Sequence, residues 1–415
     1  MGFTLFLILV CILLMLIFRI RFMEPAGLFA VLWIGFVLGS VLFLHNRFYF
    51  PYSGVIWLLL VVCLFLLVAV AFPKHKKENI EPISLPTIPW FLLLLIILLG
   101  FFSVFYNMKN KGVGVDIFTN FSALQSVSHN AAVSRYSGGE AENSIISQIL
   151  NTFIYLPALC SGYSVVYASR KKEQLICYLS FFPALFSMLL TSAKLAVVSF
   201  ILLFFIGWYI SYIVRYKSLP IIGLKKIISS AFITAFLYAL FYFSFILRIG
   251  KTSENLFQVI TNKLSIYAFG HIQGFDIWFQ QFGWNWSDYG FGSQTFLAIS
   301  SRLGWSEKKQ GVYDLISGSS TNVYTQFRPL IEDYGAIFSL VIFIILGIFT
   351  YYLFNLLLRT SSVNLFAQVF LAALYYYYYY FITSPWIYST YFLVFILFYV
   401  YLYISYQVRF IYKRR

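Results

Sequence analysis

The sequence has few charged residues. Only 10% of its 415 residues are Asp, Glu, Lys or Arg, whereas a soluble globular protein has about 25%. Hydrophobic residues make up 61% of the chain and aromatic residues 22%. This composition excludes a water-soluble protein and predicts an all-α, polytopic integral membrane protein.

Cysteine is also scarce, and several familiar motifs are missing. The four cysteines lie in or beside apolar runs without metal-ligand or disulfide spacing, so we interpret them as small core hydrophobes: Cys11, Cys63, Cys160 and Cys177. No HExxH, Cys/His cluster, paired DxD or Walker-type glycine loop is present, which predicts no metal site and disfavours an ATP-driven pump. The N-terminal MGFTLFLILV has no basic region and no small-residue cleavage site, so we expect a retained first span.

Long apolar runs fill most of the chain. A helix needs about 20 apolar residues to cross the hydrocarbon of a bilayer. By this criterion we predict about eleven spans, near residues 3–18, 28–44, 55–73, 90–106, 145–168, 175–191, 195–214, 228–247, 330–357, 364–382 and 387–406. They predict a single membrane domain over residues 1–415, with outer loops 107–144 and 248–328 as insertions.

The distribution of charge predicts the orientation. With the basic tail RFIYKRR in the cytoplasm, alternation places 17 basic and 4 acidic residues inside, and 12 basic and 10 acidic residues outside. An excess of Lys and Arg in short inner loops is the positive-inside pattern, so the net charge of +15 reflects topology and does not indicate nucleic acid. The N-terminus is then outside and the C-terminus inside.

The outer segment 248–328 is long enough to carry chemistry, whereas every inner loop is short. It contains several glycines among Trp278, Trp284, Trp286 and Tyr289. We expect short helices lying at the membrane interface, because Trp and Tyr are enriched there. Any chemistry is expected on the outer face.

The stretch TNVYTQFRPLIEDYG, residues 321–335, opens the ninth predicted span. Pro329 suits the first helical position, and Glu332 and Asp333 in the first turn would complement the positive end of the helix dipole. Arg328 has no such explanation, because its charge lies at the unfavourable end of the helix. Asn322, Tyr324, Thr325 and Gln326 add amide, hydroxyl and aromatic groups, and this combination is typical of a site for phosphorylated sugars.

Further cations lie near the predicted outer ends of other spans. In LLTSAKLAVVSF, we expect Thr191–Lys194 to form an outer turn between two spans. Lys194 there is either a side chain that snorkels to the interface or a cation beside a lipid-linked phosphate. Arg248 and Lys251 follow the eighth span and are either membrane anchors or phosphate ligands.

Two titratable residues occur together in FGHIQGFDIW. His271 is a candidate for proton transfer by residue type, although a single His in a loop is more often merely polar. Asp276 has the same two interpretations. The run Tyr375–Tyr380, near the outer end of the tenth span, is an aromatic belt or, as the less favoured alternative, a platform for sugar stacking.

These residues, in this order, resemble the Wzy-type O-antigen polymerases, a family of oligosaccharide repeat-unit polymerases. TNVYTQFRPLIEDYG resembles the family's segment from outer loop to helix, and YAFGHIQGFDIW with YGFGSQTF resembles its large periplasmic loop. LLTSAKLAVV occupies the place of a Ser-Arg segment, but this chain has Lys194 where the family usually has Arg. The resemblance covers about residues 185–345.

The resemblance implies a fold and an activity. The fold is that of a membrane glycosyltransferase of the GT-C-like class, related to O-antigen ligases and polymerases, with many helices and a large outer loop. The activity is metal-independent and requires no cofactor. It transfers a growing glycan from undecaprenyl pyrophosphate to one lipid-linked repeat unit, for O-antigen or capsule synthesis at the bacterial cytoplasmic (inner) membrane. The partners implied are this lipid-linked oligosaccharide and the bilayer; a chain-length regulator and a flippase are further partners that the resemblance allows.

The chemistry needs an acceptor hydroxyl, a base and a means of stabilising the departing pyrophosphate. Arg328 and Arg248, supported by Lys194 and Lys251, are the expected pyrophosphate ligands. Candidates for the base are Asp333, Glu332 and His271, with no preference among them. Candidates for glycan binding are Asn322, Tyr324 and Asp276.

Three other functions remain open at this point. An O-antigen ligase has the same kind of sequence and differs in its acceptor, a lipid core. A lipid-linked oligosaccharide flippase or transporter would need charges along a central passage and short loops on both faces, and this chain has few charges within its spans. A structural subunit of an export complex would need no cluster of cations near the membrane surface.

Overall fold

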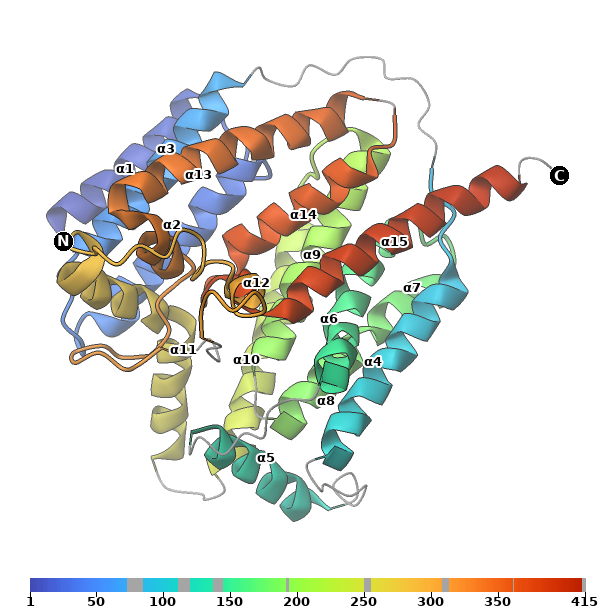
Figure 1. Ribbon diagram of the computed structural model, residues 1–415, viewed down its shortest axis with the longest axis horizontal. Helices are drawn as coiled ribbons and strands as arrows, with labels where there is room; N and C mark the ends of the chain where they lie inside the picture. Colours follow the sequence, from blue (N-terminus) through green and yellow to red (C-terminus); the bar gives the residue numbers. More distant parts are fainter. Residues whose placement is uncertain are drawn as a thin grey trace. The chain divides into compact units, whose positions relative to one another are not determined.

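The structure, a computed structural model, describes residues 1–72, 85–110, 120–136, 145–191, 194–249, 255–307, 313–360 and 362–412. Over these ranges the chain is helical and contains no strand (Figure 1). The elements are α1 (Gly2–Ile17), α2 (Pro25–Leu44), α3 (Ser53–Ala71), α4 (Trp90–Asn110), α5 (Phe121–Tyr136), α6 (Ile145–Val165), α7 (Lys171–Leu179), α8 (Phe181–Thr191), α9 (Leu195–Tyr216), α10 (Leu224–Ile249), α11 (Leu256–Trp278), the π-helix η2 (Phe279–Gly283), α12 (Leu297–Ser300), α13 (Phe327–Arg359), α14 (Leu365–Tyr379), the 3₁₀ helix η3 (Pro385–Ile387) and α15 (Ser389–Tyr412).

Nine segments of the described chain are long and apolar enough to cross a membrane. They are α2, α3, α4, α6, the pair α7–α8, α9, α13, most of α10 and most of α15. Two other predicted spans form shorter helices, α1 with 16 residues and α14 with 15. The prediction of a polytopic membrane protein is therefore confirmed, and the number of eleven spans stays a prediction.

The chain divides into two compact units. Unit 1 comprises Met1–Pro82, Lys217–Leu219 and Ser265–Ser389, and unit 2 comprises Ile83–Tyr216, Pro220–Leu264 and Thr390–Arg415. Unit 1 holds α1, α2, α3 and the region from the second half of α11 to η3. Unit 2 holds α4 to α10 and nearly all of α15.

The core of unit 1 is aromatic. Phe29 of α2 packs edge-on against Phe65 of α3 at 5.0 Å between ring centroids, and both contact the ring of Tyr378 on α14. The Tyr378 hydroxyl bonds Thr350 of α13 at 2.8 Å. The backbone carbonyl of Tyr378 accepts a hydrogen bond from the indole N–H of Trp33. These contacts hold α2, α3, α13 and α14 together.

Unit 2 is built on a close contact of α6 with α9. Gly162 of α6 lies against the backbone of Phe204, and Gly207 of α9 lies against the backbone of Leu159, so neither position has room for a Cβ atom. Small residues of this kind let membrane helices approach closely. The hydroxyl of Ser199 on α9 then bonds Tyr391 of α15 at 2.9 Å.

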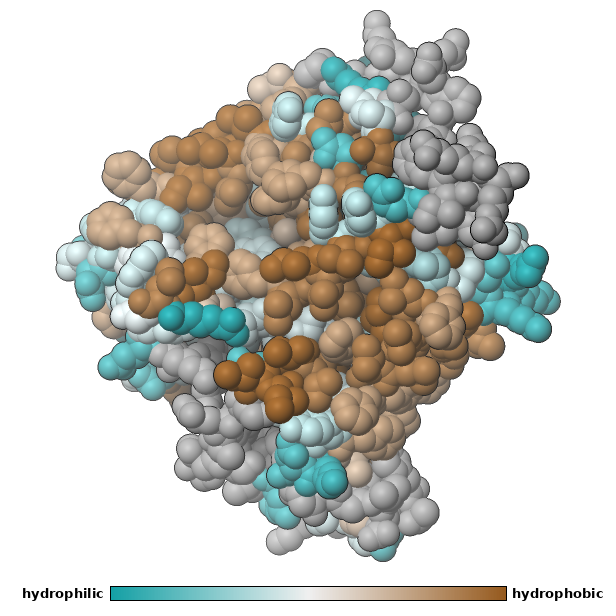
Figure 2. Space-filling view, turned by 45° about the vertical axis from the view of Figure 1, so that its right-hand side comes forward, coloured by the Kyte–Doolittle hydropathy of each residue, from teal (hydrophilic) through white to brown (hydrophobic). Residues whose placement is uncertain are grey.

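Exposed apolar side chains cover many of the spanning helices. Figure 2 shows extensive hydrophobic surface on the face in view. In α10 most apolar side chains are exposed, including Phe232, Ile233 and Phe236. Such a surface is stable in lipid and would aggregate in water.

The structure refines one expectation about local structure and corrects another. The outer segment does contain two short helices, η2 and α12, but its residues 256–278 form one helix of 23 residues, α11. The run Tyr375–Tyr380 is neither an interfacial belt nor an open stacking platform, because all six side chains are buried. A tyrosine run is ambiguous in sequence, since its rings pack as well in a core as they do at an interface.

Candidate functional site

The candidate site lies on the first two turns of α13, in unit 1. This helix begins at Phe327 and not near residue 330. Pro329 is therefore its third residue, which is tolerated because the first-turn amides have no partner within the helix. Glu332 and Asp333 fall beyond the first turn, which contains no acidic residue. The predicted role of these acids at the helix dipole is thus wrong, and their contacts explain their presence instead.

A break in the backbone separates the site from the rest of α13. Gly335 has φ 75° and ψ 166°, so it interrupts the helical backbone. The Ser339 hydroxyl lies across the break and donates to the carbonyls of Leu330 and Gly335, at 3.0 and 2.7 Å. From α3, Trp57 donates its indole N–H to the Ala336 carbonyl at 3.1 Å. Residues 327–334 therefore form a separate short helical piece that carries the site.

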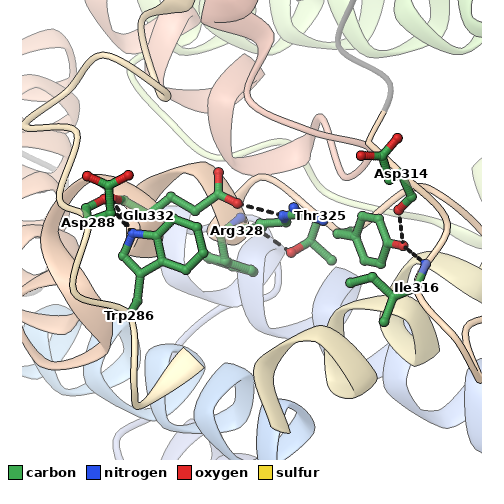
Figure 3. Close-up of polar contacts among 9 residues, drawn as sticks. Trp286, Asp288, Asp314, Ile316, Thr325, Arg328 and Glu332 are labelled. Carbon is green, nitrogen blue, oxygen red and sulfur yellow. Dashed lines mark hydrogen bonds and ion pairs between the residues drawn. The ribbon is translucent and has the colours of Figure 1, made fainter. Parts of the chain in front are cut away.

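Arg328 is held by an ion pair and by aromatic rings. Its Nε lies 2.8 Å from Oε1 of Glu332, one turn further along the helix (Figure 3). Its guanidinium carbon lies 3.8 Å from the ring centre of Tyr313, 4.6 Å from that of Tyr324 and 5.1 Å from that of Trp278. Arginine above an aromatic face is a cation–π arrangement, and it gains strength when water is excluded.

One terminal nitrogen of Arg328, Nη1, is less well satisfied than its Nε. The side chain is only 13% exposed, and its Nη1 atom is buried without a hydrogen-bond partner among the residues that the structure describes. A buried guanidinium donor without an acceptor is costly. The site therefore presents a desolvated cation whose Nη1 donor, unpaired among the described residues, suits an oxygen of a phosphate or a carboxylate.

Glu332 is the acid closest to this cation. Its side chain is 6% exposed, and its carboxylate is paired with Arg328. Its backbone carbonyl accepts from the Trp286 indole at 3.0 Å and from the Gly290 amide at 3.1 Å. The indole N–H also bonds the Asp288 carbonyl at 2.7 Å (Figure 3). The loop after η2 is thus fastened beside the ion pair.

Asp333 holds the same loop by its side chain. Its two carboxylate oxygens accept from the amides of Gln294 and Thr295, at 2.9 and 2.6 Å. Its carbonyl accepts from the Phe291 amide at 3.1 Å. There is no room for a Cβ atom on Gly290, since it would lie 2.5 Å from Oδ1 of Asp333. These contacts give Asp333 a structural role in positioning residues 290–295.

The two polar candidates that precede α13 differ in their environment. Tyr324 is fully buried. Its hydroxyl donates to the Asp314 carbonyl at 2.8 Å and accepts from the Ile316 amide at 3.1 Å (Figure 3). It therefore fixes the segment that carries Tyr313 beside Arg328. Asn322 is half-buried in the same loop.

His271 lies on α11, not in a loop, with 2% of its surface exposed. Its ring packs against Phe36 at 4.7 Å, Phe381 at 4.8 Å and Trp33 at 6.2 Å. Both ring nitrogens are buried without a hydrogen-bond partner within the described parts of the chain. Burial lowers the pKa of His271 to about 3, so the ring is neutral near pH 7 and is a poor proton acceptor.

Asp276 is fully buried one and a half turns further along α11. Its carboxylate accepts from the amides of Tyr52, Gly54 and Val55 at 2.7, 2.8 and 3.2 Å. These amides belong to the first turn of α3 and the residue before it, and such amides have no partner within the helix. Burial raises the pKa of Asp276 to about 6, against the effect of these bonds. Asp276 thus caps α3 from a neighbouring helix.

The remaining predicted cations belong to unit 2. Lys194 lies between α8 and α9, at the predicted interruption, and is only 8% exposed. Its Nζ is 3.9 Å from the ring centre of Phe245 on α10. Arg248 is three residues further along α10. Lys251 lies outside the described residues.

Nothing in the sequence singles out Tyr313 as a site residue, and Trp278 is predicted only as an interfacial aromatic. Both contact the Arg328 guanidinium, yet they are 15 and 50 residues away in the chain. Only the general preference of arginine for aromatic faces pointed to such partners. Over the described residues, no three His, Cys, Asp or Glu side chains are grouped so that they could hold a metal ion.

Comparison with known proteins identifies no relative: no family model, no curated protein and no solved structure matches this chain.

Proposed function

We propose that this protein polymerises lipid-linked oligosaccharide repeat units at the outer face of a bacterial cytoplasmic membrane. The growing glycan would be transferred from undecaprenyl pyrophosphate to the terminal sugar of a new repeat unit. One observation carries the proposal: Arg328 is a nearly buried cation whose Nη1 donor has no partner among the described residues, beside three aromatic rings and a carboxylate.

Arg328 supplies what the leaving group requires. As the bond from the anomeric carbon to the pyrophosphate oxygen breaks, negative charge grows on the phosphate oxygens. A guanidinium held in a water-poor environment stabilises that charge without moving. Trp278, Tyr313 and Tyr324 restrict the motion of the side chain. The rings also exclude water, which strengthens the attraction between cation and phosphate.

Glu332 is the base that the contacts favour. The carboxylate oxygens of Asp333 are engaged by backbone amides, and the imidazole of His271 has a pKa of about 3. Glu332 is instead paired with Arg328 through a side chain. A phosphate bound to the guanidinium would compete for this partner. The freed carboxylate could then accept the proton of the acceptor hydroxyl.

The other cations and polar residues complete the proposal. Lys194, Arg248 and Lys251 are proposed as further ligands of lipid-linked phosphates, and Asn322 as a glycan contact. A ligase that delivers the glycan to a lipid core would use the same chemistry, so the acceptor alone separates the two activities. A flippase would need neither a base nor a stabilised leaving group.

Substitution of Arg328 tests the site. We expect Arg328→Ala to insert at the normal level and to abolish long glycan chains in a strain that lacks the native gene. Arg328→Lys keeps the charge but loses the planar fork, and we expect it to retain a small part of the activity. The measurement is the glycan ladder on a gel, at matched protein level.

The matched control is Arg302→Ala, which removes an exposed arginine of the same outer segment. Wild-type ladders from this variant, together with loss in Arg328→Ala, would support the assignment. Wild-type ladders from Arg328→Ala would show that the leaving-group role is wrong. Reconstitution with a purified lipid-linked repeat unit then separates the rivals, because a polymerase forms oligomers without nucleotide, added metal or a lipid core.

A further inference from the structure

Two cysteines that are far apart in the sequence meet in unit 1. The Sγ atoms of Cys11 on α1 and Cys63 on α3 are 3.2 Å apart. They are 52 residues apart in the chain, so their spacing gave no sign of a pair. The burial of Cys11 agrees with its interpretation as a small core residue, and the contact with Cys63 is an addition to that interpretation.

The packing of α1 against α3 places the two sulfurs close enough to react with each other. Helices α1 and α3 pack against each other, and both thiols lie near the middle of their helices. A disulfide bond measures about 2.0 Å between sulfurs, so an approach of roughly 1 Å would be needed. Cys11 is fully buried, whereas Cys63 is partly exposed. A small apolar reagent can thus reach Cys63 first.

We propose that Cys11 and Cys63 form a redox-active dithiol that is converted to an intramembrane disulfide by a lipid-soluble disulfide compound. The Cys63 sulfur attacks the reagent, forms a mixed disulfide and releases one equivalent of reagent thiol. The Cys11 sulfur then displaces the second equivalent from Cys63. Two thiol protons leave Cys11 and Cys63, one S–S bond forms between them, and the reagent disulfide is reduced to two thiols.

The position of the pair gives the bond a structural consequence. Helix α3, which carries Cys63, also carries Trp57. The indole N–H of Trp57 donates a hydrogen bond to the Ala336 carbonyl, just after the break in α13. The first turn of α3 is capped by Asp276. A covalent bond from α1 would therefore fix the helix that supports residues 327–334. This inference rests on the sulfur geometry and is independent of the proposed polymerase activity.

The test uses the full-length protein in lipid bilayers, treated with 4,4′-dithiodipyridine. After denaturation and blocking of free thiols with N-ethylmaleimide, peptides are identified by mass spectrometry without reduction. We expect a peptide pair joined through Cys11 and Cys63, with two equivalents of pyridinethione released per bond. We expect the disulfide to form slowly, over a period on the order of hours, because few thiols ionise to the reactive thiolate in apolar surroundings.

Cys160 and Cys177 are controls within the same chain. Both are buried, and neither contacts another sulfur among the described residues. They should end as maleimide adducts or as single pyridyl disulfides. Cys11→Ala removes the second thiol without burying a hydroxyl, as Ser would. In this variant we expect Cys63 to remain as a stable pyridyl disulfide.

Three outcomes would overturn the inference. One is a stable pyridyl disulfide on Cys63 in the wild-type protein, with Cys11 recovered as its maleimide adduct. Another is recovery of both cysteines as maleimide adducts after prolonged treatment. The third is cross-linking of Cys63 to Cys160 or Cys177, because mobility of the chain, and not the contact of α1 with α3, would then explain the bond.

Discussion

His271 is a buried imidazole with an unusual environment. It is surrounded by aromatic rings, and neither nitrogen has a hydrogen-bond partner in the described part of the chain. Its sequence neighbours gave no sign of this, because the rings come from α2 and from Phe381. A protonatable group of this kind either packs as a neutral aromatic ring or carries a proton, and one substitution separates the two roles.

We expect His271→Phe to keep the fold and to remove part of the acid sensitivity. Burial lowers the pKa of His271 from 6.5 to about 3. The unfolded chain therefore binds a proton that the folded chain excludes, and stability falls as the pH drops below 6.5. The loss amounts to about 2 kcal/mol between pH 7 and pH 5. The measurement is the Tm of both proteins in detergent at these two pH values.

Activity of the same variant decides its role. A purely packing role predicts normal glycan ladders from His271→Phe. Loss of the ladders with an unchanged Tm at pH 7 would instead place His271 in the chemistry, against the preference for Glu332. Equal pH dependence of wild type and variant would refute the burial argument.

For Asp276 we expect the opposite effect: removal of its carboxylate should lower the stability of the folded protein. Asp276→Ala leaves the amides of Tyr52, Gly54 and Val55 without an acceptor. We expect a loss of about 1–3 kcal/mol, seen as a lower Tm. Asp276→Asn keeps one acceptor oxygen and should lose less. The control is Asp288→Ala, whose side chain is exposed; an equal effect of Asp276→Ala and this control would contradict the capping role.

At the scale of elements, α13 is two helices joined at Gly335. Its backbone angles belong to a region that glycine alone adopts readily. A Cβ atom there would also lie 2.9 Å from the ring of Tyr289. The loop that carries Tyr289 is the one fastened by Glu332 and Asp333. The break at Gly335 and the loop that carries Tyr289 are therefore packed against each other, and each restricts the position of the other.

We expect Gly335→Ala to destabilise the protein by about 1–3 kcal/mol and to lower glycan synthesis with it. The strained backbone and the contact with Tyr289 act in the same direction. Gly35→Ala in α2 is the control, since a Cβ atom there meets nothing within 4 Å and alanine favours a helix over glycine by about 0.5–1 kcal/mol. The measurement is the Tm of each variant; no difference between them would show that the backbone at Gly335 relaxes freely.

At the scale of the whole molecule, the basic residues predict its orientation in the membrane. Single cysteines introduced into a chain without the four native ones test this. Glu307→Cys should react with an impermeant maleimide on intact cells, because it belongs to the predicted outer segment. Lys172→Cys, in a predicted inner loop, should react only after lysis. Both positions are exposed, and the reverse pattern would invert the topology.

The sequence predicts the helices of this molecule better than their contacts. Apolar runs identify the nine candidate spans, because length and composition are local properties. They also place Arg328 and Glu332 near the start of one of them. The partners of Arg328 could not be predicted, since Tyr313 and Trp278 approach it through tertiary folding. The backbone amides that Asp276 and Asp333 bind could not be predicted either, because they belong to residues that are distant in the sequence.

The break at Gly335 also bears on hydrophobic mismatch. An unbroken α13 of 33 residues would measure about 50 Å, far beyond the roughly 30 Å of bilayer hydrocarbon. From Ala336 to Arg359 the helix has roughly 24 residues and measures about 36 Å, which a modest tilt accommodates. We therefore expect the bilayer to begin near Gly335 along α13. Arg328, Glu332 and Asp333 would then lie beyond that boundary, and the membrane would not need to thin or deform to expose them to a lipid headgroup.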